Sequence, residues 1–437
     1  MNKSGRRRAL RTAALILAML LVTALTSCFF SDFTKMLTES SADNGDDQQG
    51  SDSETTETER SSFFVDIKPG QTIESDGSTQ SDTIPDDEGS LDDITDDLLL
   101  ECMSSYLDNF AVEIDLTSCL DGFRIEENRV DELINRVVKV FEYKYMQDPF
   151  IFYLDGAMQV GYELQSGWGS RYLTSMTLKL KKYDRYENLD VNELEQIKAA
   201  MISEAQAIVD LAGTDRAEWE KLLIAHDELV RRISYDTSLN QSNNQTASAL
   251  LDDYSLCKGY AQSFKLICDL MSIECQVISG QADGIEHAWN LVKLDGGYYH
   301  IDVTHDDPVP DRGPSGPVDH RHFLRSDDMM SETHQWKREN YKTATADGAH
   351  YFRQNELIVN DVDMLKDKLQ KFLMISDFAD NRDDQLELLF EGTEPISQDQ
   401  FDEMFKTALS GSNLNRQRFS YQVSAGKNVL QLIIMAE

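Results

Sequence analysis

Residues Glu286–Asp307 read EHAWNLVKLDGGYYHIDVTHDD, and this stretch decides the fold of the region around it. Two runs rich in apolar residues flank Asp295-Gly296, a dipeptide typical of two-residue β-hairpin turns. With these two residues as the loop, Leu294 faces Gly297 across the hairpin. The stretch therefore predicts two antiparallel strands joined by a tight turn.

The predicted hairpin brings two titratable side chains together. In its register Asp302 lies opposite Trp289, two positions along the strand from His287. His287 and Asp302 are then diagonal neighbours on one face, close enough for the carboxylate to reach an imidazole nitrogen. Moving the turn to Gly296-Gly297 keeps them on that face but further apart, whereas a three-residue loop would separate them.

A cysteine upstream of the hairpin is a candidate nucleophile. Ser255–Lys265 reads SLCKGYAQSFK and indicates the start of an amphipathic helix, with Ser255 as its N-cap. Cys257 would lie in the first turn, where unpaired N–H groups and the helix dipole favour negative charge. Lys258 adds a positive neighbour, so the position favours a thiolate.

If this helix packs on the hairpin, Cys257, His287 and Asp302 form a Cys–His–Asp set for acyl transfer. Asp302 would fix the tautomer of His287 and stabilise its imidazolium, while His287 takes the thiol proton and returns it to the leaving amine. The backbone N–H of Cys257 would stabilise the oxyanion. The side chain of Gln245 is a candidate for a second oxyanion donor and substrate contact.

The other cysteines favour structural interpretations. A lone cysteine at a helix start is more often a small buried hydrophobic residue, and this is the alternative for Cys257 when its position is considered alone. The same interpretation suits Cys268 and Cys275, which lie in apolar patterns. Cys102 and Cys119 either pair as a disulfide or remain two buried thiols. The six cysteines include no CxxC pair and no metal-type spacing.

Two further groups of residues bear on the site. Trp289 shares the face of His287 and is a candidate substrate contact, although tryptophan in a sheet more often packs. The histidines at the end of this region follow no standard zinc spacing, so we expect no metal and no other cofactor. These histidines are His300, His305, His320 and His322.

Three motifs resemble those of a known family. The segments SLCKGYAQSFK, EHAWNLV and YYHIDVTHDDP resemble the core motifs of the transglutaminase-like superfamily, and HDELVRRISYD at His226–Asp236 resembles the helix before that core in bacterial members. The resemblance is specific over roughly 222–308. It implies a papain-like fold, in which one central helix packs on an antiparallel sheet.

The resemblance also assigns roles by motif match. It places the family's nucleophile on Cys257, its general base on His287 and its orienting carboxylate on Asp302. Bacterial members usually carry tryptophan where this chain has His305. We therefore expect His305 to reshape the pocket wall or to add a polar contact to the substrate.

The N-terminus resembles a bacterial lipoprotein signal. Basic residues precede the apolar run Ala13–Leu25, which is too short for an ordinary membrane span. The run ends in Leu25-Thr26-Ser27-Cys28, which resembles a lipobox, so Cys28 is a candidate lipidation site. The alternative is a plain signal peptide with an incidental cysteine. Either interpretation predicts an extracytoplasmic protein, and the lipobox predicts a lipid anchor in the bacterial cell membrane.

Beyond the signal, composition divides the chain. An acid-rich stretch follows that cannot bury enough apolar surface to fold, with Phe63-Phe64-Val65 as one apolar island that could dock elsewhere. We expect a signal peptide over 1–27, a disordered tether over 28–97, an N-terminal α+β extension over 98–213, a catalytic core over 214–351 and a C-terminal α+β unit over 352–437. The predicted class is α+β throughout.

Apolar periodicity predicts individual elements within these parts. Helices are expected near 130–141, 189–212, 216–233, 255–271, 361–373 and 398–409. Strands are expected at 150–164, 172–180, 275–280, 286–294, 298–304, 385–390, 418–423 and 429–436.

Charge and site together narrow the function. The 437-residue chain carries a formal charge of −37, which disfavours nucleic acid and anionic lipid as partners because both would repel it. We expect a cysteine acyltransferase that acts on peptide or protein carboxamides at the cell envelope, by hydrolysis first and by cross-linking second. The alternative is a binding module that uses the same fold without catalysis.

Overall fold

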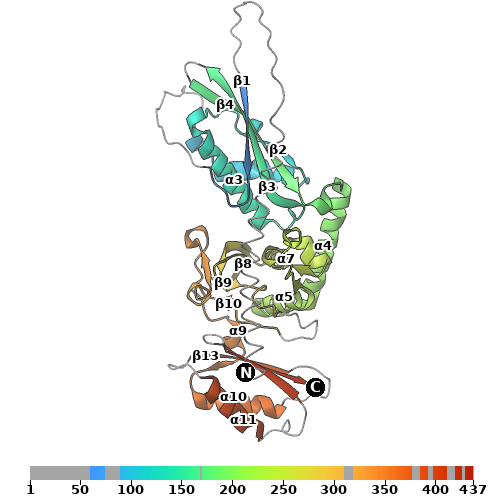
Figure 1. The fold of residues 1–437 in the computed structure, drawn as a ribbon, viewed down its shortest axis with the longest axis vertical. Coiled ribbons are helices and arrows are strands. Elements are labelled where there is room, and N and C mark those ends of the chain that lie inside the picture. The colour runs from blue at the N-terminus through green and yellow to red at the C-terminus, as the bar shows by residue number, and fades with distance from the viewer. Residues whose placement is uncertain are drawn as a thin grey trace, which may run out of the picture. The chain divides into compact units, whose positions relative to one another are not determined.

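The computed structural model describes residues 60–73, 89–167, 170–309, 318–375, 384–391, 397–410, 419–425 and 429–436 (Figure 1). The predicted signal peptide, Cys28 and most of the predicted tether lie outside these residues. Within the described part, no helix is both long enough and apolar enough to cross a membrane. The described chain mixes helices with mainly antiparallel sheets, as the sequence predicts.

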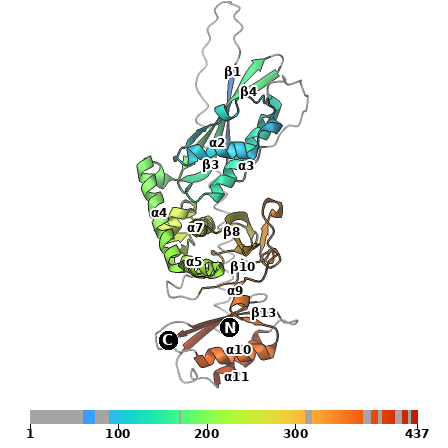
Figure 2. The same cartoon turned by 180° about the vertical axis from the view of Figure 1, so that it is seen from behind.

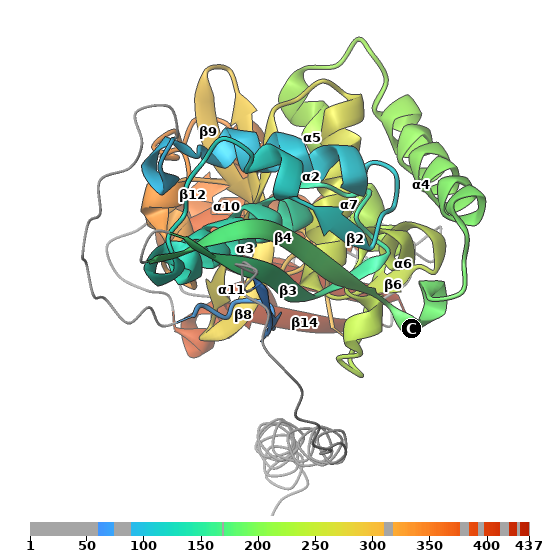
Figure 3. The same cartoon turned by 90° about the horizontal axis from the view of Figure 1, so that it is seen from above.

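The N-terminal extension contains a four-stranded antiparallel sheet in the order β1-β3-β4-β2. Its long central strands β3 and β4 run side by side and twist strongly (Figure 3). Helix α3 buries the apolar face that its sequence predicts. The bounds are β1 Arg60–Ile67, α2 Asp96–Leu107, β2 Glu113–Asp115, α3 Val130–Gln147, β3 Leu154–Gly167 and β4 Ser170–Lys182.

Strand β1 corrects the predicted tether, which includes residues 60–67. Phe63 lies opposite Tyr162 of β3, and the two rings stack with centroids 5.1 Å apart. Ile67 is buried while Phe64 stays exposed, which is the alternation of an edge strand packed on one face. The apolar island is therefore part of the folded extension.

Helices α4 and α5 lead from the extension into the core, where short strands β5 and β6 pair in parallel before the central helix α7. Strand β6 places the chain directly before Cys257, the first residue of α7. The bounds are α4 Val191–Ala212, α5 Glu218–Arg232, β5 Ser234–Tyr235, α6 Thr246–Leu251, β6 Tyr254–Ser255 and α7 Cys257–Leu270.

The core sheet has five antiparallel strands in the order β10-β9-β8-β7-β11, and α7 lies beside β8 (Figure 1). The predicted hairpin register is confirmed, because Leu294 pairs with Gly297 and both loop residues, Asp295 and Gly296, have positive φ. The bounds are β7 Cys275–Ala282, β8 Ile285–Leu294, β9 Gly297–Ile301, β10 Phe323–Arg325, α8 Asp327–Met330 and β11 His334–Trp336.

Strand β9 ends at Ile301, three residues before the predicted end of the strand. Residues 303–306 form a turn instead, and a bend follows at Asp307. The backbone N–H of Thr304 and that of His305 donate to the Asp302 carboxylate, which folds the chain back at this point. We call residues 302–307 the catalytic loop.

Small residues let α7 approach the sheet closely. Ala261 of α7 packs against Val277 and Ala288, and the Asn290 side chain donates a 2.8 Å hydrogen bond to the Ala261 carbonyl. Cys257 packs at the edge of the same cluster. The contact therefore fixes the start of α7 over strand β8.

The start of α7 differs from prediction in one respect. Leu256 is the N-cap residue, and the Ser255 hydroxyl donates to the Asn243 carbonyl instead of capping the helix. The Asn244 side chain supplies a cap from outside, accepting a 2.9 Å hydrogen bond from the backbone N–H of Lys258. A Cβ added at Gly259 would lie 1.9 Å from the Ser255 hydroxyl oxygen, so this close approach requires glycine.

The C-terminal unit confirms the predicted alternation of helices and strands. Its sheet has the order β12-β13-β15-β14, and α10 and α11 lie together on one side of it (Figure 2). Buried side chains, mostly leucine and phenylalanine, fill the space between the helices and the sheet. The bounds are α9 Tyr351–Gln354, β12 Ile358–Val359, α10 Val362–Ile375, β13 Asp384–Phe390, α11 Gln398–Ser410, β14 Phe419–Ala425 and β15 Val429–Ala436.

Cys102 and Cys119 form a disulfide, which resolves the alternative that the sequence leaves open. The bond joins α2 to the short turn after β2, across 17 positions of sequence. It therefore closes a loop within the N-terminal extension.

We predict that the double variant Cys102→Ser/Cys119→Ser lowers the free energy of unfolding by about 3 kcal/mol, because the unfolded chain regains the entropy of an open loop of this length. Denaturant unfolding of both proteins measures the difference. A reducing agent should lower the midpoint of the wild type and leave that of the double variant unchanged. Equal midpoints for the oxidised wild type and the double variant would contradict the prediction.

Candidate active site

Cys257 is a half-buried free thiol at the first position of α7. The amide groups of the first helical turn have no partner within the helix, so the backbone N–H of Cys257 is available to an oxyanion at this end. Cys268 and Cys275 are buried free thiols, which confirms their structural interpretation.

His287 of β8 lies between the thiol and a carboxylate. Its Nε2–H donates to Asp302 Oδ2 at 2.8 Å, and a hydrogen bond joins the imidazole to the side chain of Cys257. Since Nε2 faces Asp302, Nδ1 is the nitrogen that remains for the sulfur. The structure therefore brings together the three side chains that the sequence predicts.

Electrostatics at this site favour a charged imidazole. Burial alone would lower the pKa of His287, but the charge of Asp302 and hydrogen bonds to Asp302 and Cys257 outweigh burial and raise the pKa to about 10. Burial alone would raise the pKa of Asp302, but His287 and His305 hold it well below its usual value. Asp302 is thus a buried carboxylate that remains ionised.

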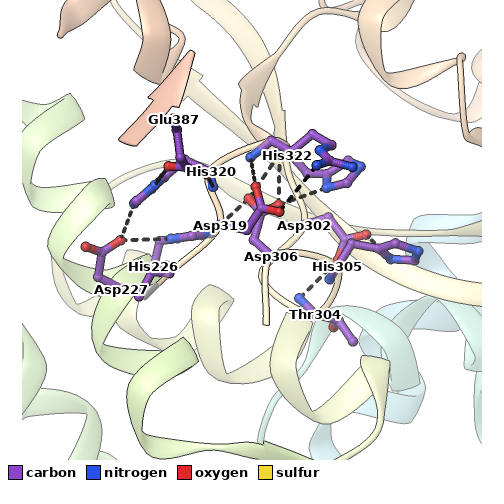
Figure 4. A network of polar contacts seen from close by, with 12 residues as sticks. His226, Asp227, Asp302, Thr304, His305, Asp306, Asp319, His320, His322 and Glu387 are labelled. Atoms are coloured by element: carbon purple, nitrogen blue, oxygen red, sulfur yellow. Dashed lines mark hydrogen bonds and ion pairs between the residues drawn. The ribbon is translucent and has the colours of Figure 1, made fainter. Parts of the chain in front are cut away.

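Asp302 accepts hydrogen bonds from three imidazoles. His305 Nδ1 lies 2.8 Å and His334 Nε2 lies 2.9 Å from the same Oδ2 that His287 approaches. The nitrogens of His287 and His305 that face this oxygen are 3.1 Å apart. We call His287, Asp302, His305 and His334 the catalytic cluster; Figure 4 shows the part of it around Asp302 and His305.

The two added histidines differ in their environment. His334 is fully buried, burial lowers its pKa, and its Nδ1 lies 2.8 Å from the Thr333 hydroxyl. His305 is 30% exposed at its side chain, and Asp302 raises its pKa against the opposing effect of burial. His305 is therefore placed to contact a substrate, whereas the buried His334 hydrogen-bonds to Asp302 inside the protein.

Two of the residues predicted to contact the substrate are buried. Trp289 is 1% exposed and donates through Nε1 to His300 Nδ1 at 3.0 Å, so it packs beneath His287 instead of lining a surface. Gln245 is fully buried, and its amide nitrogen donates to the Tyr186 hydroxyl and the Ser248 hydroxyl. These hydrogen bonds hold the Gln245 side chain in the packing around α6. Its amide group is therefore occupied and does not serve as the predicted second oxyanion donor.

The sequence predicts that Lys258 places a positive charge beside the thiol, but the structure buries this side chain. Its side chain is buried over the ring of Tyr145, 3.7 Å from the ring centroid, and hydrogen-bonds to the Tyr145 hydroxyl. Burial lowers the pKa of Lys258 to about 7, against an opposing effect of Cys257. Near neutral pH a smaller fraction of this amine is therefore protonated than of an exposed lysine.

The structure adds two residues that sequence reasoning missed. His334 comes from β11, and no motif connects it to the hairpin. Tyr235 of β5 pairs with Ser255, two residues before Cys257. Burial raises the pKa of Tyr235, and the charge of Cys257 adds to that shift. The phenol thus lies within electrostatic reach of the sulfur.

The catalytic cluster has enough donors to hold a metal ion, since its four ligand atoms lie within 4.8 Å of one another. The fit is poor in one respect. Metal-bound imidazoles usually donate their second N–H to a carboxylate or carbonyl. Here the second nitrogen of His287 faces Cys257, and that of His334 lies beside a hydroxyl. This arrangement suits an acid–base pair with the thiol better than a metal.

Comparison with known proteins agrees with this core. Residues 205–303 match the transglutaminase-like superfamily, and this range contains Cys257, His287 and Asp302. The fold is therefore α+β with a transglutaminase-like core, as the sequence predicts.

Individual relatives are distant. The chain is 25% identical over 153 residues to kyphoscoliosis peptidase of Homo sapiens, and 24% identical to that of Mus musculus. The match covers 31% of this chain and 22% of each peptidase, so the chain spans about a fifth of the length of these curated relatives.

Solved structures that match part of the chain include a TGase, with a TM-score of 0.26 and 13% identity over 37% of this chain and 48% of the other. Another is the periplasmic domain of TgpA from Pseudomonas aeruginosa, with a TM-score of 0.20 and 10% identity over 34% and 70% of the two chains.

We predict that iodoacetamide alkylates Cys257 at pH 6 at least about tenfold faster than an ordinary exposed thiol, which carries very little thiolate at that pH. Replacing His287 by Ala should remove the advantage, because the imidazole that contacts the sulfur is lost. Peptide mapping by mass spectrometry measures the rate at each cysteine. His300→Gln is the matched control, and Cys268 and Cys275 should stay unmodified. Equal rates in wild type and His287→Ala would contradict the assignment.

We also predict that Asp302→Asn lowers the pKa of His287 from about 10, because burial lowers this pKa and the largest effect that opposes burial, that of the carboxylate, is lost. The imidazolium would be lost at lower pH in the variant than in the wild type. Titration of the histidine ring protons by NMR measures the shift. The resonance of His300, which pairs with Asp327, serves as the internal reference. An unchanged His287 titration would contradict the assignment of Asp302.

Proposed function

We propose that this protein is an extracytoplasmic cysteine acyltransferase that hydrolyses peptide or protein carboxamides. The observation that carries the proposal is the position of His287, which contacts the Cys257 thiol through one side of its ring and the ionised Asp302 through the other. A thiol, a base and an orienting carboxylate in this order are the elements of nucleophilic acyl transfer.

The first half of the reaction follows from these positions. The thiol proton passes to His287, where the raised pKa of the imidazole holds it, and the sulfur of Cys257 attacks the carbonyl carbon of the carboxamide. The backbone N–H at the start of α7 stabilises the oxyanion that forms. The C–N bond then breaks, the leaving amine takes the proton from His287, and a thioester remains on Cys257.

The second half restores the enzyme. His287 removes a proton from water, and the hydroxide attacks the thioester carbon. The C–S bond breaks, the acid leaves, and the proton returns to the sulfur. A lysine amine in place of water would give a cross-link through the same steps. Asp302 keeps the imidazolium in place during both halves, since it stays ionised.

Two further observations support the proposal. The curated relatives that match are peptidases by name, although the match covers only part of each. The Cys102–Cys119 disulfide suits an oxidising compartment outside the cytoplasm. We further propose that Cys28 is lipidated and anchors the folded part to the cell membrane, which the basic and apolar N-terminal sequence supports.

Mass spectrometry of envelope peptides incubated with the purified protein tests the proposed reaction. Wild type should cleave or deamidate its substrates, and Cys257→Ala should reduce the rate by about a thousandfold or more, because the nucleophile is lost. Cys268→Ala is the matched control and should retain the activity. Hydrolysis of a peptide bond adds the mass of water, whereas cross-linking loses ammonia. Binding of peptides without any mass change in either protein would favour the non-catalytic module.

A further inference from the structure

A second group of histidines and carboxylates lies next to the catalytic loop and takes no part in the proposed reaction. His226 and Asp227 are neighbours on α5, and His320 precedes strand β10. His226 Nδ1 lies 3.1 Å and His320 Nε2 lies 3.0 Å from the same oxygen, Asp227 Oδ1. We call these three residues the second histidine cluster; Figure 4 shows Asp227 between the two imidazoles.

We propose that the second histidine cluster binds one divalent transition-metal ion, Zn²⁺ by its chemistry. Its three ligand atoms lie within 4.8 Å of one another. Two imidazole nitrogens and one carboxylate oxygen, with a remaining position for water, form a donor set that Zn²⁺ favours. The two separations between an imidazole nitrogen and Asp227 Oδ1, 3.1 and 3.0 Å, are within a few tenths of an ångström of those between ligands of a tetrahedral zinc ion.

The side chains that hydrogen-bond to the far side of each ligand are the stronger evidence for a metal site. His226 Nε2 lies 3.2 Å from Asp306 Oδ2, and His320 Nδ1 lies 2.6 Å from Glu387 Oε2. Arg231 donates to the second oxygen of Asp227 at 3.2 Å. Each ligand is therefore oriented by a partner on its far side, as metal-binding histidines and carboxylates usually are.

The arrangement of carboxylates gives a second argument. Each of the two imidazoles has a carboxylate oxygen at both ring nitrogens. A divalent ion at Asp227 Oδ1 would therefore lie among the carboxyl groups of Asp227, Asp306 and Glu387, which favour a cation.

The surroundings restrict movement and attract cations. His226 and His320 are buried, and the Tyr351 ring stacks on the His320 imidazole with centroids 3.8 Å apart. Burial, together with the negative charges of Asp306 and Glu387, raises the pKa of the neighbouring Asp319 to about 7. The site is thus rigid and rich in negative charge, whereas the imidazoles of the catalytic cluster lack such carboxylates behind them.

The proposed ion would connect three parts of the chain. Its ligands come from α5 and from the segment before β10, and Glu387 of β13 belongs to the C-terminal sheet. Asp306 lies in the catalytic loop, and its backbone N–H donates to the Asp302 carbonyl at 3.3 Å. The role that follows is structural: the ion fixes the loop that carries Asp302 against the C-terminal unit.

Zinc titration of the metal-free full-length protein, kept in a mild detergent, tests the proposal. We expect one equivalent of Zn²⁺ to bind, and His320→Gln or Asp227→Asn to abolish binding. Glu387→Gln should weaken the affinity tenfold to a hundredfold, because it alters only the orienting partner of His320. His305→Gln, which alters the catalytic cluster, should bind as the wild type does. Circular dichroism of each metal-free variant verifies that it folds.

Cobalt substitution tests whether the thiol of Cys257 is a ligand. Co²⁺ in the second histidine cluster should give visible bands of a nitrogen and oxygen site and no thiolate charge-transfer band, with or without prior alkylation of Cys257. The proposal is overturned if the wild type binds no Zn²⁺. It is also overturned if His305→Gln removes the ion while His320→Gln retains it, or if a thiolate band appears, since the ion would then belong to the catalytic cluster.

Discussion

The buried charge of Asp302 is the constraint on which the site depends. An isolated ionised carboxylate in a protein interior costs several kcal/mol, so it persists only where donors surround it. Two backbone N–H groups of the catalytic loop and three imidazoles supply those donors. The imidazoles come from β8, the loop itself and β11, so one charge determines how the loop, the hairpin and the far edge of the sheet fit together.

Local patterns predict most of this core from sequence. Apolar periodicity locates the long helices and strands, and Asp295-Gly296 alone fixes the hairpin register because both residues tolerate positive φ. That register places His287 and Asp302 next to each other, so their pairing could be predicted without a structure. The position of Cys257 follows as well, since small residues on α7 and β8 permit close packing there.

What the sequence could not predict depends on contacts between distant segments. His334 reaches Asp302 from 32 positions away, and nothing in its own sequence context indicates a site. Gln245 and Trp289 have suitable chemistry, but burial and hydrogen bonds to Tyr186 and His300 remove them from the surface. Likewise, β1 belongs to an acid-rich stretch and is ordered only by its pairing with β3.

Glu387 connects the C-terminal unit to the core through its contact with His320, although it lies 85 positions beyond Asp302 in the chain. A truncated protein ending before β13 would keep every residue of the proposed catalytic set and the whole region that matches the superfamily. It would nevertheless lose the carboxylate that orients His320, and the polar contacts from His320 through Asp227 and His226 to Asp306 would lose one end. A shortened protein whose ends follow the motifs would therefore have altered contacts next to the catalytic loop.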